Sequence, residues 1–410
     1  MSEQPVVQVY NFEQVLQHWW IAALAFGVSL VATPVCRWIA YHFGIVDRPD
    51  DLLKPHARPI AYLGGVGICI GLLAGLAGAA TVLHQIGEEW QTLLSAWGAL
   101  DMRAVLHNPI WNLASIAAAC VLIMIIGLID DVRNIKPRKK LMGQVVAACI
   151  LLLGGVGYRM AVVITSPLLG PLSDFIIIPL SAAMCIVMVI STCNATNLID
   201  GLDGLCGGVT GIIATGFLIL AAYLALFDRN PGTDELRVYL SLAMAGAILG
   251  FLPYNIPPAS IFMGDAGSML IGFFVATMMA LFCQEGNLRW LAGACMIFAL
   301  PILDTGLAVV RRIISKKNIF EGDRSHLYDQ LVDRGMSVKK VVYLFYVLAA
   351  AAAVTGVTLA MNLKFRFAMP IYAMILGTAF LLFHLKGMLR PERSSEKKQS
   401  SEHLIKQDQP

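Results

Sequence analysis

Carboxylate and amide side chains recur in four short segments of this sequence, each beside an apolar stretch. The first segment is the pair Asp130-Asp131, which directly follows the apolar run CVLIMIIGLI, and the last is a single aspartate, Asp304, inside an apolar run. The two middle segments contribute Asn194, Asn197, Asp200 and Asp203, then Asn255, Phe262 and Asp265. A carboxylate at the edge of hydrocarbon costs roughly 2.5–3.5 kcal/mol, so such residues mark functional sites.

These side chains suit the binding of a phosphate group together with Mg²⁺. Mg²⁺ takes oxygen ligands, commonly one or two carboxylates plus the phosphates of a substrate. Lysines and arginines nearby can hold the remaining phosphate charge. Phosphoryl transfer needs little beyond such positioning and charge neutralisation. For a single aspartate, such as Asp130 or Asp200, a helix cap is an equally good explanation, because aspartate favours helix N-termini.

Membrane helices must position these segments, because the composition excludes a soluble protein. The 410 residues are 58% hydrophobic and 14% charged, with a mean hydropathy of +0.71, whereas soluble domains average about 25% charged residues. The apolar runs do not alternate, which favours helices over a barrel. We therefore predict an all-α polytopic membrane protein with about eleven transmembrane helices, at residues 19–41, 61–83, 112–129, 141–160, 176–194, 206–227, 236–252, 267–283, 289–311, 341–361 and 367–387.

The distribution of basic residues predicts the orientation of the chain. One set of alternate loops, with the C-terminal tail, carries 23 of the 30 lysines and arginines. The positive-inside rule then places the N-terminus outside and the C-terminus in the cytoplasm, with the acidic segments on the cytoplasmic side. We expect a short extracytoplasmic segment (1–18), a transmembrane domain (19–387) and a polar, disordered cytoplasmic tail (388–410).

Six segments within about residues 20–385 match one protein family, in the same order. They are DRPDDLLKPHARPIAYLGGVG (47–67), GLIDDVRNIKPRKKLMGQ (127–144), NATNLIDGLDGLCGG (194–208), FLPYNIPPASIFMGDAGSMLIGF (251–273), PILDT (301–305) and DRSHLYDQL (323–331). Together they resemble the polyprenyl-phosphate N-acetylhexosamine-1-phosphate transferases, glycosyltransferase family 4. These enzymes start cell-wall and cell-surface glycan synthesis on undecaprenyl phosphate.

The resemblance implies a reaction, its substrates and a cofactor. The lipid phosphate would attack the sugar-bearing phosphate of a UDP-N-acetylhexosamine, releasing UMP and forming a lipid pyrophosphate sugar. Mg²⁺ is the expected cofactor, with Mn²⁺ as a substitute. The expected partners are the UDP-sugar, undecaprenyl phosphate and membrane lipid, with no nucleic acid and with a homodimer as one option. The expected location is the inner (plasma) membrane, with a cytoplasmic active site.

The resemblance also assigns roles to residues. Asp265 and Asn197 would bind Mg²⁺, Asp130 would activate or orient the lipid phosphate, and Asp131 would support the metal or a neighbouring lysine; we take Asp130, Asp131 and Asp265 as the candidate catalytic residues. The expected substrate-binding residues are Lys54, Lys140, Asp200, Asp203, Asn255, Phe262, Arg324 and His326. The two lysines would hold phosphates, although both also fit as ordinary positive-inside residues.

The segment DRSHLYDQL departs from the family pattern. Many relatives carry two or three histidines there, whereas this chain has only His326, with Tyr328 and Asp329 where further histidines would stand. A triple-histidine motif typifies the MurNAc-pentapeptide branch, so its absence favours transfer of N-acetylglucosamine-1-phosphate. The alternatives are phospho-MurNAc-pentapeptide transfer and, from a different class, secondary transport. A transporter would place its polar residues near the midplane and show matched halves, and the sequence has no internal repeat.

Overall fold

The computed structural model describes residues 17–47, 59–86, 89–227, 233–284, 287–314, 316 and 326–387. Two expected substrate-binding residues, Lys54 and Arg324, lie outside this part of the chain. The predicted C-terminal tail and all but the last two residues of the predicted N-terminal segment also lie outside it.

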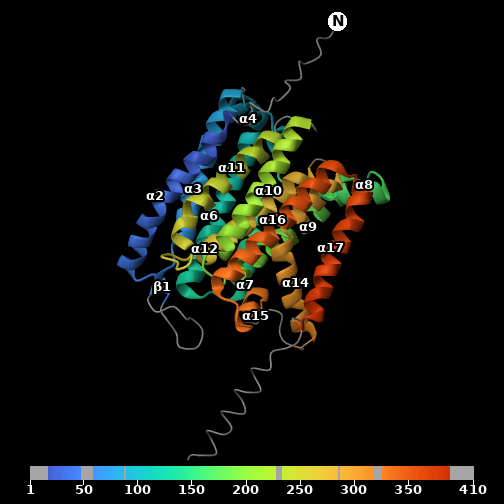
Figure 1. The fold of residues 1–410 in the computed structure, drawn as a ribbon. Helices are drawn as coiled ribbons and strands as arrows, with labels where there is room; N and C mark the ends of the chain where they lie inside the picture. The colour runs from blue at the N-terminus through green and yellow to red at the C-terminus, as the bar shows by residue number, and fades with distance from the viewer. Residues whose placement is uncertain are drawn as a thin grey trace, which may run out of the picture.

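The described residues form a bundle of helices with one short β-hairpin (Figure 1). In chain order the elements are α2 (Trp19–Phe43), β1 (Val46–Asp47), β2 (Ile60–Ala61), α3 (Gly64–Ile86), α4 (Glu89–Gly98), α5 (Met102–His107), α6 (Pro109–Arg133), α7 (Pro137–Leu153), α8 (Val162–Leu169), α9 (Asp174–Leu198), α10 (Leu205–Phe227), α11 (Thr233–Asn255), α12 (Gly264–Cys283), α13 (Leu288–Ile297), α14 (Ala299–Ile314), α15 (Leu327–Asp333), α16 (Val338–Asn362) and α17 (Phe365–Leu385). The prediction of an all-α membrane protein is confirmed.

The number of membrane crossings remains a prediction. Within the described residues, nine helices are long and apolar enough to span a membrane, and the bent pair α13–α14 would make a tenth. The remaining expected span, 141–160, corresponds to α7, which has 17 residues and ends at Leu153. Gly154 and the positive-φ Gly155 follow it directly (φ +85°), so the predicted end of this span at residue 160 was wrong. Glycine adopts positive φ readily, which helps the chain leave the helix there.

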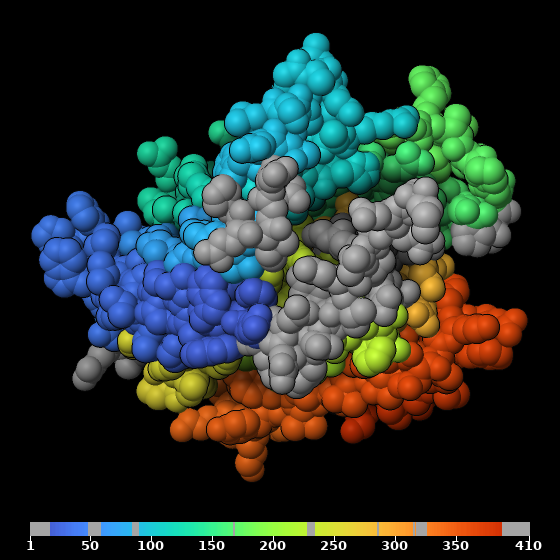
Figure 2. All heavy atoms as spheres, turned by 90° about the horizontal axis from the view of Figure 1, so that it is seen from above, coloured from blue at the N-terminus to red at the C-terminus, as the bar shows by residue number. Residues whose placement is uncertain are grey.

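Helix α12 forms the centre of the bundle. All its residues from Ala266 to Cys283 are buried, and α3, α6 and α9 pack around it. By contrast, α2 and α17 lie at the periphery, seen in blue and red in Figure 2, and keep large exposed apolar side chains such as Trp38 and Leu385. This arrangement is what a lipid solvent dictates, because an apolar side chain facing lipid needs no protein cover.

The ninth predicted span is not one straight helix. Helices α13 and α14 meet at an angle of 73°, with Phe298 between them. Pro301 lies in the first turn of α14, where a missing N–H costs nothing, but its ring would clash with the carbonyl of Ile297, four residues earlier, if α13 continued unbroken. The break turns α14 toward α9, which it contacts.

The loops at one end of the bundle are tied together by short backbone pairings. Strands β1 and β2 pair antiparallel, with Val46 opposite Ala61. Ala61 also forms a parallel bridge to Ile261, in the segment that precedes α12. Figure 1 shows β1 and α15 at this same end of the bundle, which is where the acidic segments converge.

Candidate active site

Helices α6 and α12 touch at the point where both carry acidic residues. Gly127 of α6 allows this approach, because a Cβ atom there would lie 2.5 Å from the backbone oxygen of Asp265. Asn134 ends α6 in the left-handed conformation, with its N–H bonded to the backbone oxygen of Asp130. The last turn of α6 therefore presents Asp130 and Asp131 to the first turn of α12.

Asp131 caps the N-terminus of α12 from a different helix. Its Oδ1 accepts a hydrogen bond from the N–H of Asp265 (2.8 Å) and its Oδ2 one from the N–H of Ala266 (3.1 Å). Gly264 makes room for this carboxylate, because a Cβ there would lie 2.6 Å from Asp131 Oδ2, and its φ of +67° suits glycine. The first amides of a helix have no partner within the helix. Both carboxylate oxygens of Asp131 thus support the backbone at the start of α12.

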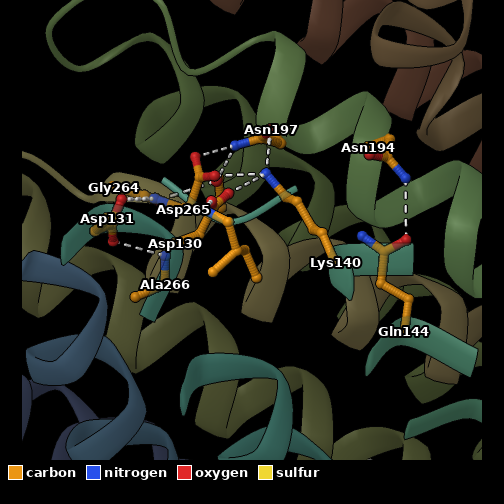
Figure 3. A network of polar contacts seen from close by, with 11 residues as sticks. Asp130, Asp131, Lys140, Gln144, Asn194, Asn197, Gly264, Asp265 and Ala266 are labelled. Carbon is orange, nitrogen blue, oxygen red and sulfur yellow. Dashed lines mark hydrogen bonds and ion pairs between the residues drawn. The ribbon is translucent and has the colours of Figure 1, made fainter. Parts of the chain in front are cut away.

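The ammonium of Lys140 joins three of the expected functional side chains (Figure 3). Its Nζ lies 2.5 Å from Asp265 Oδ2, 3.1 Å from Asp130 Oδ2 and 3.2 Å from Asn197 Oδ1. The amide nitrogen of Asn197 donates to Asp265 Oδ1 at 2.6 Å and to the Ser268 hydroxyl at 3.0 Å. Lys140 therefore contacts Asn197, which lies 57 residues further along the chain, and Asp265, which lies 125 residues further along.

The charge balance around Lys140 keeps it protonated. Burial alone lowers the pKa of an ammonium, but the carboxylates of Asp265 and Asp130 more than offset this, so the pKa of Lys140 is raised. One ammonium thus faces two carboxylates. One helical turn further along α7, Gln144 accepts a hydrogen bond from Asn194 of α9 (3.1 Å; Figure 3), which links the two helices that carry Lys140 and Asn197.

The turn between α9 and α10, residues 199–204, brings two more aspartates to this place. Burial and the nearby carboxylates of Asp265, Asp131 and Asp203 raise the pKa of Asp200 well above its usual value. Asp203 uses Oδ2 to accept the N–H of Ala259 (2.9 Å). Acidic side chains therefore extend from the end of α6 to this turn.

Asn255 holds the same turn from the side of α11. Its Oδ1 accepts the N–H of Gly204 (3.0 Å), and its Nδ2 donates to the Ile261 carbonyl (3.1 Å). Both ends of the amide are therefore engaged with backbone, and the residue is buried. In this structure Asn255 supports the loops of the site.

Phe262 is fixed by the neighbouring β-hairpin. Its N–H donates to the carbonyl of Ala61 (2.8 Å), its carbonyl accepts the N–H of Gly64 (3.0 Å), and its ring lies 5.9 Å from that of Tyr62. Burial, then the charge of Asp47, raise the pKa of Tyr62, so its hydroxyl stays protonated beside these carboxylates.

A cavity of about 420 Å³ lies among these residues. It is lined by Asp47, Tyr62, Asp130, Asp131, Asn134, Asn197, Asp200, Gly201, Leu202, Asp203, Asn255, Phe262, Gly264 and Asp265. Six of these are aspartates and none is a lysine or arginine. A second cavity of about 920 Å³ adjoins it, with Gly201, Leu202, Asp203 and Phe262 as shared walls. The second cavity extends to Arg37, Trp38 and Tyr41 on α2.

The structure thus brings together most of the residues predicted from sequence. Among the described residues, those that line the smaller cavity are Asp130, Asp131, Asn197, Asp200, Asp203, Asn255, Phe262 and Asp265, and Lys140 contacts three of them. Three lining residues with polar side chains were not predicted: Asp47, Tyr62 and Asn134. Asp47 and Tyr62 belong to the matching segment 47–67, which was the available signal for them.

His326 lies apart from this lining. It is buried, and its Nδ1 lies 2.8 Å from Asp304 Oδ2, while Asp304 Oδ1 accepts the N–H of Leu327 (2.8 Å). Its ring stacks on Tyr328, with centroids 5.6 Å apart and planes 7° from parallel. A contact between His326 and substrate therefore stays a prediction, and in this structure the residue directly precedes α15.

Comparison with known proteins identifies the family. Residues 113–283 match Glycosyl transferase family 4. The chain is 28% identical over 351 residues to the probable undecaprenyl-phosphate N-acetylglucosaminyl 1-phosphate transferase of Bacillus subtilis, covering 82% of this chain and 84% of that protein. It is 33% identical over 337 residues to the decaprenyl-phosphate N-acetylglucosaminephosphotransferase of Mycolicibacterium smegmatis, covering 78% of this chain and 76% of that protein. A phospho-N-acetylmuramoyl-pentapeptide-transferase of Mycobacteroides abscessus is 27% identical over 366 residues, covering 82% of this chain and 95% of that protein.

These relatives are all named as transferases, and the family match at 113–283 includes Asp130, Asn197 and Asp265. The resemblance inferred from the motifs is therefore confirmed. The chain belongs to glycosyl transferase family 4, the polyprenyl-phosphate N-acetylhexosamine-1-phosphate transferases, and is an integral membrane enzyme of that family.

Proposed function

We propose that this enzyme transfers N-acetylglucosamine-1-phosphate from UDP-N-acetylglucosamine to undecaprenyl phosphate. An oxygen of the lipid phosphate forms a bond to the sugar-bearing phosphorus of the donor. The bond from that phosphorus to the bridging diphosphate oxygen breaks, and UMP leaves with that oxygen. The products are undecaprenyl-pyrophosphate-N-acetylglucosamine and UMP, and the reaction is the first membrane step of cell-wall or surface glycan synthesis.

The observation that carries this proposal is the convergence of three oxygen atoms on one cation. Oδ2 of Asp130, Oδ2 of Asp265 and Oδ1 of Asn197 all lie within 3.2 Å of Lys140 Nζ. Carboxylate and amide oxygens are the ligands that Mg²⁺ prefers, so the donor set fits this metal. Bound by Asp265 and Asn197, Mg²⁺ or Mn²⁺ would neutralise charge on the diphosphate of the donor.

The chain's own residues supply the remaining requirements. Asp130 is placed to orient the lipid phosphate, which is mostly dianionic at pH 7 because its second pKa is near 6, so orientation matters more than proton removal. Lys140 stays protonated and can hold phosphate charge. Asp203 and Phe262 line both cavities and Asp200 lines the smaller one, which suits contacts with the nucleotide and sugar.

The branch of the family is proposed from two supports. A relative named for N-acetylglucosamine reaches 33% identity over 78% of the chain, whereas pentapeptide transferases reach 27% over 82% of it, or 36% over only 44% of it. The chain also has Tyr328 and Asp329 in place of further histidines. The positive-inside distribution supports a cytoplasmic site in the inner membrane.

The test is an assay of the purified protein in detergent with undecaprenyl phosphate, Mg²⁺ and each of the two UDP-sugar donors. We expect UMP release with UDP-N-acetylglucosamine and none with UDP-MurNAc-pentapeptide, and loss of release when EDTA removes the metal. UMP from the pentapeptide donor alone would reverse the choice of donor. Folded protein that releases no UMP from either donor would refute the transferase proposal.

A further inference from the structure

The turn that carries Asp200 and Asp203 is contacted at both ends by tyrosine hydroxyls. It begins after Leu198, the last residue of α9, and ends at Gly204, just before α10. Leu198 exposes a backbone carbonyl that helix bonding does not use, because the last carbonyls of a helix have no partner within it. The carbonyl of Gly204 accepts the N–H of Gly208 (2.9 Å), and a carbonyl oxygen can accept a second hydrogen bond.

Tyr328 of α15 contacts the first end of the turn. Its hydroxyl donates to the carbonyl of Leu198 at 3.0 Å, and burial keeps the pKa of this phenol well above its usual value, so the donor proton is retained. The ring edge lies against the turn itself, because a Cβ atom at Gly201 would be 2.1 Å from the Tyr328 hydroxyl oxygen.

Tyr346 of α16 contacts the other end. Its hydroxyl donates to the carbonyl of Gly204 at 2.6 Å. Gly204 has a φ of +73°, a conformation that favours glycine. The ring also fills the space beside Gly208, where a Cβ atom would lie 2.1 Å from Tyr346 Cζ.

The orientation of Tyr328 is itself fixed by buried groups. His326 stacks on its ring, and Asp304 of α14 holds both His326 and the N–H of Leu327. Asp304 is 1% exposed and His326 is 4% exposed, so both ends of this contact are shielded from water. A continuous chain of contacts thus runs from α14 through Tyr328 to the turn that lines both cavities.

We propose that Tyr328 and Tyr346 are positioning residues that clamp the turn 199–204, so that Asp200 and Asp203 are held in place for the nucleotide donor. This inference rests on the proposed function and deepens it, since it names residues that set donor affinity without touching the donor. It also gives a role to Tyr328, a position at which the sequence departs from the family's histidine pattern.

The first measurement is steady-state kinetics of Tyr328→Phe, Tyr346→Phe and the double variant. Each change deletes one hydroxyl and keeps the ring, so packing is preserved. One lost hydrogen bond of typical strength corresponds to about a 5-fold effect. We expect the KM for UDP-N-acetylglucosamine to rise about 5-fold in each single variant and about 25-fold in the double variant. The KM for undecaprenyl phosphate and kcat should stay within about 2-fold.

The matched control is Tyr343→Phe. Tyr343 lies one turn before Tyr346 on α16, and its side chain is 67% exposed. This variant also deletes a tyrosine hydroxyl from α16, but not the one that is bonded to the turn. We expect wild-type KM values and an unchanged melting temperature for this variant. An equal rise in donor KM in Tyr343→Phe would overturn the proposal.

The second measurement does not depend on activity. Hydrogen–deuterium exchange of peptides covering residues 199–206 reports the turn directly, in the full-length protein without substrates. We expect exchange to become at least about 5-fold faster in the double variant and to stay unchanged in Tyr343→Phe. Unchanged exchange in the double variant overturns the clamp, and faster exchange with an unchanged donor KM overturns its role in donor binding. If the wild-type enzyme releases no UMP from either donor, the proposed function fails, and exchange alone then decides whether the clamp exists.

Discussion

Two ion pairs in this protein are both shielded by helices, yet they differ in charge balance. Near the start of α11, Arg237 pairs with Asp234, and the Arg237 side chain has no exposed surface. Its Nη1 also donates to the Leu281 carbonyl at 3.0 Å, and its guanidinium lies 5.8 Å from the Phe282 ring centre. In the active site, Lys140 faces two carboxylates beside a cavity with six aspartates in its lining.

The difference separates a structural pair from a site that awaits a cation. A buried ion pair in which the charge of the cation is balanced by that of the anion has little further attraction for a ligand. An uncompensated cluster of carboxylates next to open space is costly on its own, and a divalent cation or a cationic partner relieves that cost. Charge imbalance beside a cavity, more than the presence of buried charge, therefore distinguishes the functional region.

The largest effect is expected from removing one carboxylate of the site. Asp265→Asn keeps the shape of the side chain and the hydrogen bond from the backbone N–H of residue 265 to Asp131. It removes the charge that would hold the metal. We expect UMP release to fall on the order of 1,000-fold, with the melting temperature within a few degrees of wild type. Activity within tenfold of wild type would show that Asp265 is not a metal ligand, and the charge imbalance would then need another explanation.

The structural pair should behave in the opposite way. Arg237→Leu leaves Asp234 without its buried cation, and breaking such a pair typically costs about 3–5 kcal/mol. We expect the apparent melting temperature in detergent to fall by about 5–10 °C, with the donor KM of the folded protein within about 2-fold of wild type. The double change Arg237→Leu/Asp234→Leu should recover much of the loss. Equal stability of the two variants would contradict the comparison, as would a large change in donor KM.

The sequence could predict the membrane helices and the meeting of Asp130, Asn197 and Asp265. The length of the apolar runs and the order of the motifs can be read without a structure. It could not predict what Asp131 does. Its partner amide at Asp265 lies 134 residues away, so the local sequence offers only a second carboxylate beside Asp130. The cap explanation considered for single aspartates holds here, across two helices rather than within one.

The other differences have local causes that the hydropathy pattern hides. Residues 290–303, on both sides of the bend between α13 and α14, carry no charged side chain, so the bend leaves no mark in hydropathy, and Pro301 was the available signal. The hydroxyls of Tyr328 and Tyr346 act on backbone carbonyls, which have no residue-type signature at all. Lys54 and Arg324 lie outside the described residues, so their roles stay predictions.

The smallest effect is expected at Asp329, an acidic residue near the site that belongs to neither kind of cluster. Burial, together with Asp304 and Asp333, raises its pKa from 3.8 to about 6, although His326 acts in the opposite direction. Because the folded-state pKa lies above the unfolded value, the stability it contributes is complete below about pH 4 and is lost as the pH rises through about 6. Asp329→Asn has no carboxyl group to titrate. The melting temperature of the variant minus that of wild type should therefore increase by about 2 °C between pH 4 and pH 7. UMP release at pH 7.5 should stay within about 2-fold, since Asp329 is not among the residues that line the described cavities. A melting-temperature difference that shrinks with rising pH would show that Asp329 is stabilised as an anion, and a tenfold loss of activity would place it with the carboxylates of the site.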